Sequence, residues 1–296
     1  MGKTMLEGLR LPVIMAPMFL VSGPDLVVAG CRAGVLGTFP ALNQRSTEGY
    51  DAWLGAIAER LADKPAPFGV NLVVHRDNAR LKADLAVTVR HKVPLVITSL
   101  GVDPELIAAV QSYGGRVFHD VTTARHAEKA AQAGVDGLIA VCAGAGGHAG
   151  TLSPFALVPE IRRFFGGTLV LGGAISSGRH VAAARLIGAD AAYVGTRFIA
   201  TRESLASDAY KQMLVRSASG DIVYTQAVSG MPANFLKPSL LAAGLDPAGR
   251  RAEVDIGAGE AKAWRDVWSA GQGVGSITDI PATAELVDRL VAEYSA

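Results

Sequence analysis

Residues 141–150 read Val-Cys-Ala-Gly-Ala-Gly-Gly-His-Ala-Gly, so an apolar segment runs directly into a glycine-rich loop that carries one imidazole. The loop has little side-chain bulk, which allows a flat ligand to lie against its backbone while His148 projects toward the ligand's reactive face. The alternative is a tight turn with a surface histidine. We interpret the segment as a buried strand followed by an active-site loop, and the rest of the chain supports that interpretation.

Apolar, β-rich segments recur along the chain, with segments of helical pattern between them. They are continuous rather than alternating, which is typical of parallel strands covered on both faces. Eight such units predict an α/β fold, a TIM (β/α)8 barrel whose ligands bind at the carboxyl ends of the strands; an open doubly wound sheet is the alternative. The eight expected strands are residues 13–18, 35–39, 68–73, 95–100, 117–121, 137–142, 168–173 and 191–196.

The repeating pattern ends after Arg202. Residues 204–219 have a helical pattern, residues 221–275 are rich in proline and glycine and are expected to be irregular, and a last helix is expected over residues 281–294. A segment inserted after the eighth strand of a barrel lies over its mouth. We therefore predict a barrel over residues 1–205, a lid or substrate domain over residues 206–275, and a C-terminal helix returning to the barrel over residues 276–296.

Charge and cysteine content limit the partners. The net charge of +1 and the absence of a basic run argue against nucleic acid or an anionic membrane surface. Cys31 and Cys142 form neither a disulfide framework nor the paired spacing of a metal site. The apolar run at residues 11–21 is too short to span a membrane and contains Pro12 and Pro17. We expect a cytoplasmic protein without a metal, and leave open whether it forms a homo-oligomer.

Two strands carry candidate ligand contacts near their ends. The first is followed by Ala16, Pro17 and Met18; a proline there is structurally cheap, but Met18 also offers a soft surface to a planar ring. Asn71 lies in an otherwise apolar strand, where a buried amide needs hydrogen-bond partners from the barrel or from a ligand. We favour the ligand.

Two later loops have the composition of a phosphate site. Gly172 and Gly173 end the seventh strand before a helix, and Gly195 and Thr196 end the eighth. Unobstructed backbone N–H groups near a helix N-terminus favour an anion, and barrels commonly hold phosphate after strands seven and eight. The glycines around Gly146 do not form a dinucleotide fingerprint, because the next helix begins too late, at Ser153-Pro154.

His119 and Asp120 end the fifth strand and are expected to point toward the barrel mouth, where they either touch a ligand or hydrogen-bond to one another. The remaining histidines fall in loops or on helical patterns, and we expect them to be solvated.

In this order, these motifs resemble those of the nitronate monooxygenase (2-nitropropane dioxygenase) family, which are FMN-dependent TIM-barrel enzymes. The resemblance covers about residues 11–277 and includes Ala270-Gly271-Gln272-Gly273. It implies that FMN contacts Ala16, Pro17, Met18, Asn71, Gly146, Gly147, Gly172, Gly173, Gly195, Thr196 and Gln272, and that His148 is the catalytic base or polar anchor. Asp120 departs from the pattern, because many relatives carry a lysine there.

The activity implied by the resemblance is oxidation of an alkyl nitronate, or of a nitroalkane after His148 removes its α-proton, with O2 to a carbonyl compound and nitrite. The same superfamily contains NAD(P)H:quinone reductases and enoyl-thioester reductases, which share most of these motifs and form the main alternative. A flavin-binding module without turnover is a remote one. We also expect segments 224–237 and 264–272 to cover the flavin.

Overall fold

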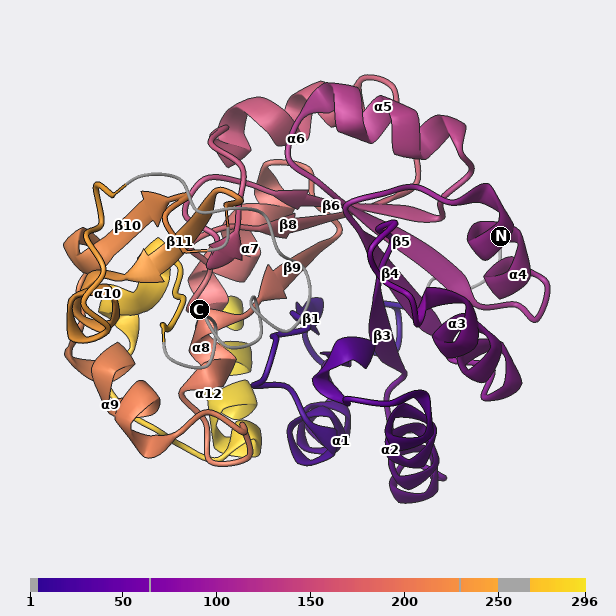
Figure 1. Cartoon of the computed structure of the whole chain (residues 1–296), viewed down its shortest axis with the longest axis horizontal. Helices are drawn as coiled ribbons and strands as arrows, with labels where there is room; N and C mark the ends of the chain where they lie inside the picture. The colour runs from indigo at the N-terminus through magenta and orange to yellow at the C-terminus, as the bar shows by residue number, and fades with distance from the viewer. Residues whose placement is uncertain (1–4, 64, 229, 250–266) are drawn as a thin grey trace.

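The computed structural model describes residues 5–63, 65–228, 230–249 and 267–296. Eight parallel strands form one sheet in the order β1-β9-β8-β6-β5-β4-β3-β2 (Figure 1). The backbone N–H of Met15 donates to Leu36 O at 2.8 Å, and the N–H of Leu36 donates to Val13 O at 3.0 Å, so the two edges meet and the sheet closes. The predicted TIM barrel is confirmed, and the open sheet is wrong. The strands are β1 (Val13–Met15), β2 (Gly37–Pro40), β3 (Phe68–Val73), β4 (Leu95–Ser99), β5 (Arg116–Val121), β6 (Gly137–Val141), β8 (Thr168–Gly172) and β9 (Ala191–Val194).

Helices surround the sheet, with α5 and α6 at the top of the view in Figure 1 and α1 and α2 at the bottom. Their starts are encoded locally, because a polar side chain at the residue before the helix accepts a free backbone N–H, as Ser46 does from Gly49 and Thr123 does from His126. The helices of the repeating units are α1 (Pro24–Ala33), α2 (Thr47–Arg60), α3 (Leu81–Arg90), α4 (Pro104–Gln111), α5 (Ala124–Gln132), α6 (Pro154–Arg162) and α7 (Gly178–Leu186).

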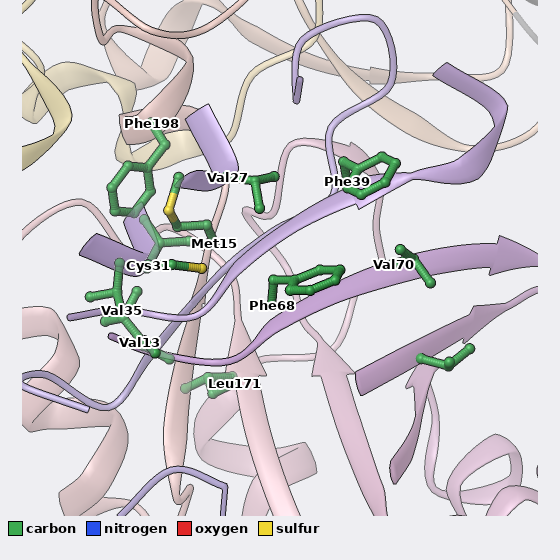
Figure 2. Packing of buried hydrophobic residues seen from close by; sticks show 14 of the residues in the cluster. Val13, Met15, Val27, Cys31, Val35, Phe39, Phe68, Val70, Leu171 and Phe198 are labelled. Atoms are coloured by element: carbon green, nitrogen blue, oxygen red, sulfur yellow. The ribbon is translucent and has the colours of Figure 1, made fainter. Parts of the chain in front are cut away.

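Two apolar layers hold the barrel together. One lies between the sheet and the helices, and Figure 2 shows part of it, including Met15, Cys31 and Phe198. The other fills the inside of the barrel. Strand β5 contributes to both, since Val117 and Val121 belong to the outer layer and Phe118 to the inner one. Because side chains alternate along a strand, Asp120 shares the inward face with Phe118.

The last helix, α12 (Thr283–Ser295), packs against α1 and α7 in the outer layer. Leu286, Val287 and Leu290 are its buried residues in that layer. The approach to α7 is very close, because a Cβ at Gly178 would lie 2.0 Å from Leu290 O. Glycine is therefore required where the two helices cross.

The segment after the eighth strand is more regular than the sequence predicts. It contains α9 (Asp208–Arg216), β10 (Ile222–Thr225), β11 (Ala233–Leu236) and α10 (Lys237–Ala242), which gather at the left of the view in Figure 1. Residues 221–249 were expected to be irregular, and this is wrong. The two strands are short and separated by a connection with Gly230 and Pro232, so the alternation that predicts a strand is hard to detect. Residues 250–266, including Trp264, lie outside the described residues.

Strand β11 also pairs with a strand that sequence reasoning missed. Gly147 and His148 form β7, with Ala233 opposite His148 and Asn234 opposite Gly147 in an antiparallel pair. The order β10-β11-β7 makes a second, three-stranded sheet. Thr196 was predicted to end the eighth strand, but it begins the short helix α8 (Thr196–Ile199). The division at residues 205 and 275 stays a prediction.

Candidate active site

One cavity of about 750 Å³ opens at the carboxyl ends of the barrel strands. Its size falls within the range of roughly 300–1,000 Å³ that is usual for small-molecule and cofactor sites. It brings together residues that are up to 257 positions apart in the sequence, from Ala16 to Gly273. The predicted site residues that line it are Ala16, Pro17, Met18, Asn71, Gly146, Gly147, His148, Gly172, Gly173, Gly195 and Thr196.

Gln272 is not among the described residues that line this cavity, whereas its neighbours Gly271 and Gly273 are. Its backbone N–H donates to Gly144 O at 2.9 Å, and its side-chain oxygen lies 3.1 Å from where a Cβ of Gly144 would be. Gln272 therefore contacts the glycine-rich loop at Gly144 without lining the described cavity.

The loop that carries His148 is fixed by the second sheet. Asn234 Nδ2 donates to Ala145 O at 2.7 Å, and the Tyr224 hydroxyl donates to Ala149 O at 3.1 Å, on either side of the β7 pairing. Asn234 is buried, so its amide has little freedom to exchange this partner for water. The hairpin of the inserted segment thus sets the position of the imidazole.

His148 has exposed surface, but the surface faces the cavity, and protein surrounds the ring at longer range. This desolvation lowers the pKa of His148 to about 4. The imidazole is therefore neutral at pH 7, with one nitrogen able to donate a hydrogen bond and the other to accept a proton. An anion bound beside it would raise the pKa again.

Glycines bring three loops together at one end of the cavity. A Cβ at Gly271 would lie 2.6 Å from Gly144 O, and a Cβ at Gly146 would lie 2.8 Å from the backbone nitrogen of Gly271. The Thr196 hydroxyl joins the same cluster by accepting the Gly271 N–H at 2.9 Å. Because backbone meets backbone here, a larger residue could fit only if the loops moved apart.

The loop after β8 adds a polar group that the described part of the chain does not pair. Gly173 has a φ of +143°, and a Cβ there would lie 2.8 Å from Ala143 O, so glycine is needed. Ser176, four residues beyond the end of β8, lines the cavity, and its buried Oγ has no hydrogen-bond partner among the described residues. A buried hydroxyl in that state is expected to meet a ligand or water.

A polar chain crosses the floor of the cavity on neighbouring strands. Asn71 Nδ2 donates to Ile97 O at 3.2 Å and to Ser99 Oγ at 2.7 Å, and the Ser99 hydroxyl donates to Asp120 Oδ2 at 2.9 Å. Burial raises the pKa of Asp120 to about 7, although the Ser99 hydrogen bond opposes this. The amide nitrogen of Asn71 is thus used inside the barrel, and a ligand would meet its carbonyl oxygen.

His119 and Asp120 point to opposite faces of β5 and are not bonded to each other. Thr98 Oγ1 lies 2.7 Å from His119 Nδ1 on the outer face. Burial lowers the pKa of His119 to about 4, and the nearby His126 and Lys129 lower it further. His119 is buried and bonds Thr98 of the neighbouring strand β4, and it also lines the cavity, so its contact with a ligand stays a prediction.

Sequence reasoning missed several residues of the cavity wall. Tyr210 of α9 and Trp268 stack with ring centroids 5.0 Å apart and planes 11° apart, and both line the cavity. Nothing in the local sequence pairs two aromatic residues 58 positions apart. Tyr193 and Ser99 lie within predicted strands, where an inward-facing position was the available signal. Within the described ranges, no group of three or more His, Cys, Asp or Glu side chains is placed to hold a metal ion, and no helix is long and apolar enough to cross a membrane.

Comparisons with known proteins identify the family and support the barrel fold. The model of the nitronate monooxygenase family matches residues 3–293. The nitronate monooxygenase of Paraburkholderia phytofirmans is 29% identical over 293 residues, with 82% of this chain and 78% of that protein covered. A nitroalkane oxidase structure from Streptomyces ansochromogenes superposes with a TM-score of 0.87 at 27% identity, covering 99% of this chain and 98% of that one.

A third similar protein has a different name. The (3aS,4S,5R,7aS)-5-hydroxy-7a-methyl-1-oxo-octahydro-1H-indene-4-carboxyl-CoA dehydrogenase of Rhodococcus jostii is 32% identical over 238 residues. The alignment covers 80% of this chain and 66% of that protein, just under two thirds of its length.

Proposed function

This chain belongs to the nitronate monooxygenase family of flavin-dependent oxidoreductases, and from that premise we propose that it binds FMN and oxidises alkyl nitronates with O2 to carbonyl compounds and nitrite. The observation that carries the proposal is the shared cavity, in which the glycine-rich loops after β8 and β9 and the imidazole of His148 line one space. The family match confirms the resemblance seen in the motifs.

The cavity fits a flavin mononucleotide in both size and chemistry. Among the described residues the buried Ser176 hydroxyl has no hydrogen-bond partner, as expected of a group that meets a phosphate oxygen. Gly195 leaves room, because a Cβ there would make only ordinary contacts, 3.5 Å from Ala16 and 3.6 Å from Met18. We propose that the phosphate is held by the loops of Gly172, Gly173, Gly195 and Thr196 together with Ser176, and the ring by Ala16, Pro17, Met18, Asn71, Gly146 and Gly147.

When bound, FMN supplies the electron transfer and the reaction with O2. His148 has a different task. Its neutral imidazole can donate a hydrogen bond to an oxygen of a nitronate anion and so fix the anion in the cavity. With a neutral nitroalkane, its unprotonated nitrogen can accept the α-proton, but a pKa of about 4 makes it a weaker base than an ordinary histidine. We therefore propose that pre-formed nitronate is the better substrate.

The inserted segment is proposed to act as the lid of this site. Met231, Trp268 and Tyr210 line the cavity from that segment. Their apolar surface would exclude water from the substrate, and the fixed β7 pairing would keep His148 in place during turnover. We propose the same boundaries as expected from the sequence, residues 206–275, with the barrel before them and the C-terminal helix after them.

An NAD(P)H-dependent reductase of a quinone or a thioester is the second candidate. The similarity to a carboxyl-CoA dehydrogenase favours it, and the cavity wall includes Lys129 of α5, whose charge suits an anionic substrate. The two candidates use the same cofactor and differ in what reduces it.

A spectrum of the purified protein followed by two mixing experiments tests the proposal. We expect a yellow protein that releases FMN, consumes O2 and forms nitrite with a pre-formed alkyl nitronate, and stays oxidised when mixed anaerobically with NADH or NADPH. Rapid bleaching by a reduced nicotinamide without nitrite formation would favour the reductase. A colourless protein that cannot be reconstituted with FMN would overturn both candidates.

A further inference from the structure

Asp120 has a carboxyl oxygen that nothing in the described structure uses. Its Oδ2 accepts the Ser99 hydroxyl at 2.9 Å, whereas its Oδ1 is buried and has no hydrogen-bond partner among the described residues. The residue lines the cavity and faces the inside of the barrel, in the layer of side chains nearest the carboxyl ends of the strands. An unpaired buried carboxyl oxygen is costly, so its retention calls for a partner.

The neighbours of this carboxyl hold it in one orientation. Ser99 receives the Asn71 amide at 2.7 Å and therefore directs its own hydroxyl proton to Oδ2 of Asp120. The order of donors runs from β3 through β4 to β5, and it ends at the carboxyl. Because Oδ2 is occupied as an acceptor, Oδ1 is the atom left for a ligand in the cavity.

The charged and titratable groups around Asp120 do not neutralise it. The phenol of Tyr193 on β9 interacts with Asp120. Burial, and to a smaller extent the charge of Asp120, raises the pKa of Tyr193 well above 10, so the phenol stays protonated. His148 of β7 and His119 on the other face of β5 have pKa values of about 4 and are neutral. His126 and Lys129 of α5 lower the pKa of His119 and are not among the groups that act on Asp120. Burial raises the pKa of Asp120 to about 7, and no cation of the described residues offsets it, so the carboxyl carries a proton in mildly acidic solution.

We propose that Oδ1 of Asp120 contacts the bound flavin and, in its protonated form, donates a hydrogen bond to an acceptor atom of the flavin ring. The inference rests on the proposed FMN site, and it assigns to a neutral acid the place where many relatives carry a lysine. Deprotonation would replace the donor with an unpaired negative charge facing an electron-rich ring. Flavin affinity and the flavin spectrum therefore depend on the protonation of this one side chain.

The test measures flavin binding rather than turnover. FMN-loaded wild-type protein and the Asp120→Asn variant are dialysed to equilibrium at about pH 6 and pH 8, and the free and bound flavin are quantified; visible spectra are recorded across the same range. For one proton with a folded pKa of about 7, the Kd should rise about tenfold between these pH values. Asp120→Asn keeps a donor but cannot ionise, so its Kd should not show this rise, and Asp120→Ala should bind more weakly at pH 6.

Two controls separate this effect from others. The second ionisation of the FMN phosphate, near pH 6, is present in every variant, and riboflavin, which lacks the phosphate, should show the Asp120-dependent part alone. Exposed Asp77 provides a matched substitution, and Asp77→Asn should behave as wild type. A wild-type protein that binds FMN with the same Kd and spectrum at both pH values, or an Asp120→Asn variant that keeps the wild-type pH dependence, would overturn this assignment and leave the FMN site standing. Failure of the wild-type protein to bind FMN at all would overturn both.

Discussion

Replacing His148 with alanine should leave FMN bound while removing most turnover. The imidazole sits on β7, whereas the proposed phosphate contacts lie on the loops after β8 and β9, so the cofactor keeps its main anchors. The alanine retains the backbone pairing with Ala233, and the loop should keep its position. Loss of side-chain chemistry is therefore separable from loss of structure.

The size of the effect should differ between two substrates. For a neutral nitroalkane the variant loses its proton acceptor, which typically costs about 100- to 10,000-fold in rate. For a pre-formed nitronate it loses only a hydrogen bond to a charged group, worth about 1.5–3 kcal/mol, or roughly 10- to 150-fold. Because the pKa of His148 is about 4, the wild-type nitroalkane rate should gain no acid limb until the pH approaches that value.

The assay is nitrite release and O2 consumption with both substrates, on protein whose flavin content has been measured by absorbance. His75→Ala is the matched control, because His75 does not line the described cavity and pairs with Asp77 instead. Near-native and equal rates with both substrates in flavin-replete His148→Ala protein would refute the reasoning. An acid limb near pH 6.5 in the wild-type protein would refute the desolvated imidazole.

Three further predictions concern the frame of the site. Gly271→Ala places a Cβ 2.6 Å from Gly144 O and should cost about 1–3 kcal/mol of unfolding free energy and weaken FMN binding. Gly55→Ala on α2 is the control, because the added Cβ would have nothing within 4 Å, and it should stabilise the protein by about 0.5–1 kcal/mol. Calorimetry measures the stability of both variants, and titration with FMN measures their affinity. Asn234→Ala removes the donor to the loop carbonyl and should cost about 1–3 kcal/mol and lower turnover with FMN retained; unchanged kcat would contradict the loop's dependence on the hairpin. The raised pKa of Asp120 adds stability that is fully present below about pH 4 and is lost as pH rises through about 7. In flavin-free protein, Asp120→Asn should therefore gain stability over wild type with rising pH, by up to about 4 kcal/mol near pH 8. A pH-independent difference between the two proteins in denaturant melts would contradict this prediction.

The barrel could be predicted because parallel strands buried on both faces leave continuous apolar segments in the sequence. Strands such as β3 were expected almost to the residue. The position of the glycines at 172–173 and 195, at the carboxyl ends of two strands, could also be predicted, because each ends or follows such a segment. These are local signals, and the barrel closure then places the strand ends around one cavity.

The parts that could not be predicted depend on distant pairing. Gly147 and His148 form a strand only because Ala233 and Asn234 lie opposite them, and two residues carry no periodicity. A hydrogen bond between Asp120 and its neighbour His119 was one of the two expectations for this pair. Alternation along β5 instead turns the two side chains to opposite faces, and Asp120 accepts a hydrogen bond from Ser99 on another strand. Gln272 belongs to a motif of the family resemblance. In the structure its backbone N–H bonds Gly144 O and its side-chain oxygen lies beside Gly144.

The pairing of β7 with β11 also has a consequence for the order of folding. All eight strands of the barrel are complete at Val194, but the partner of His148 lies at Ala233, 85 residues after the histidine. Contacts of such long sequence separation form late, because loop closure must be achieved before they contribute. A ribosome-bound chain that ends before residue 233 contains all eight barrel strands but lacks both α12 and the partner of His148. The imidazole should therefore become fixed only after the barrel strands have been made, and competence for catalysis should come late in synthesis.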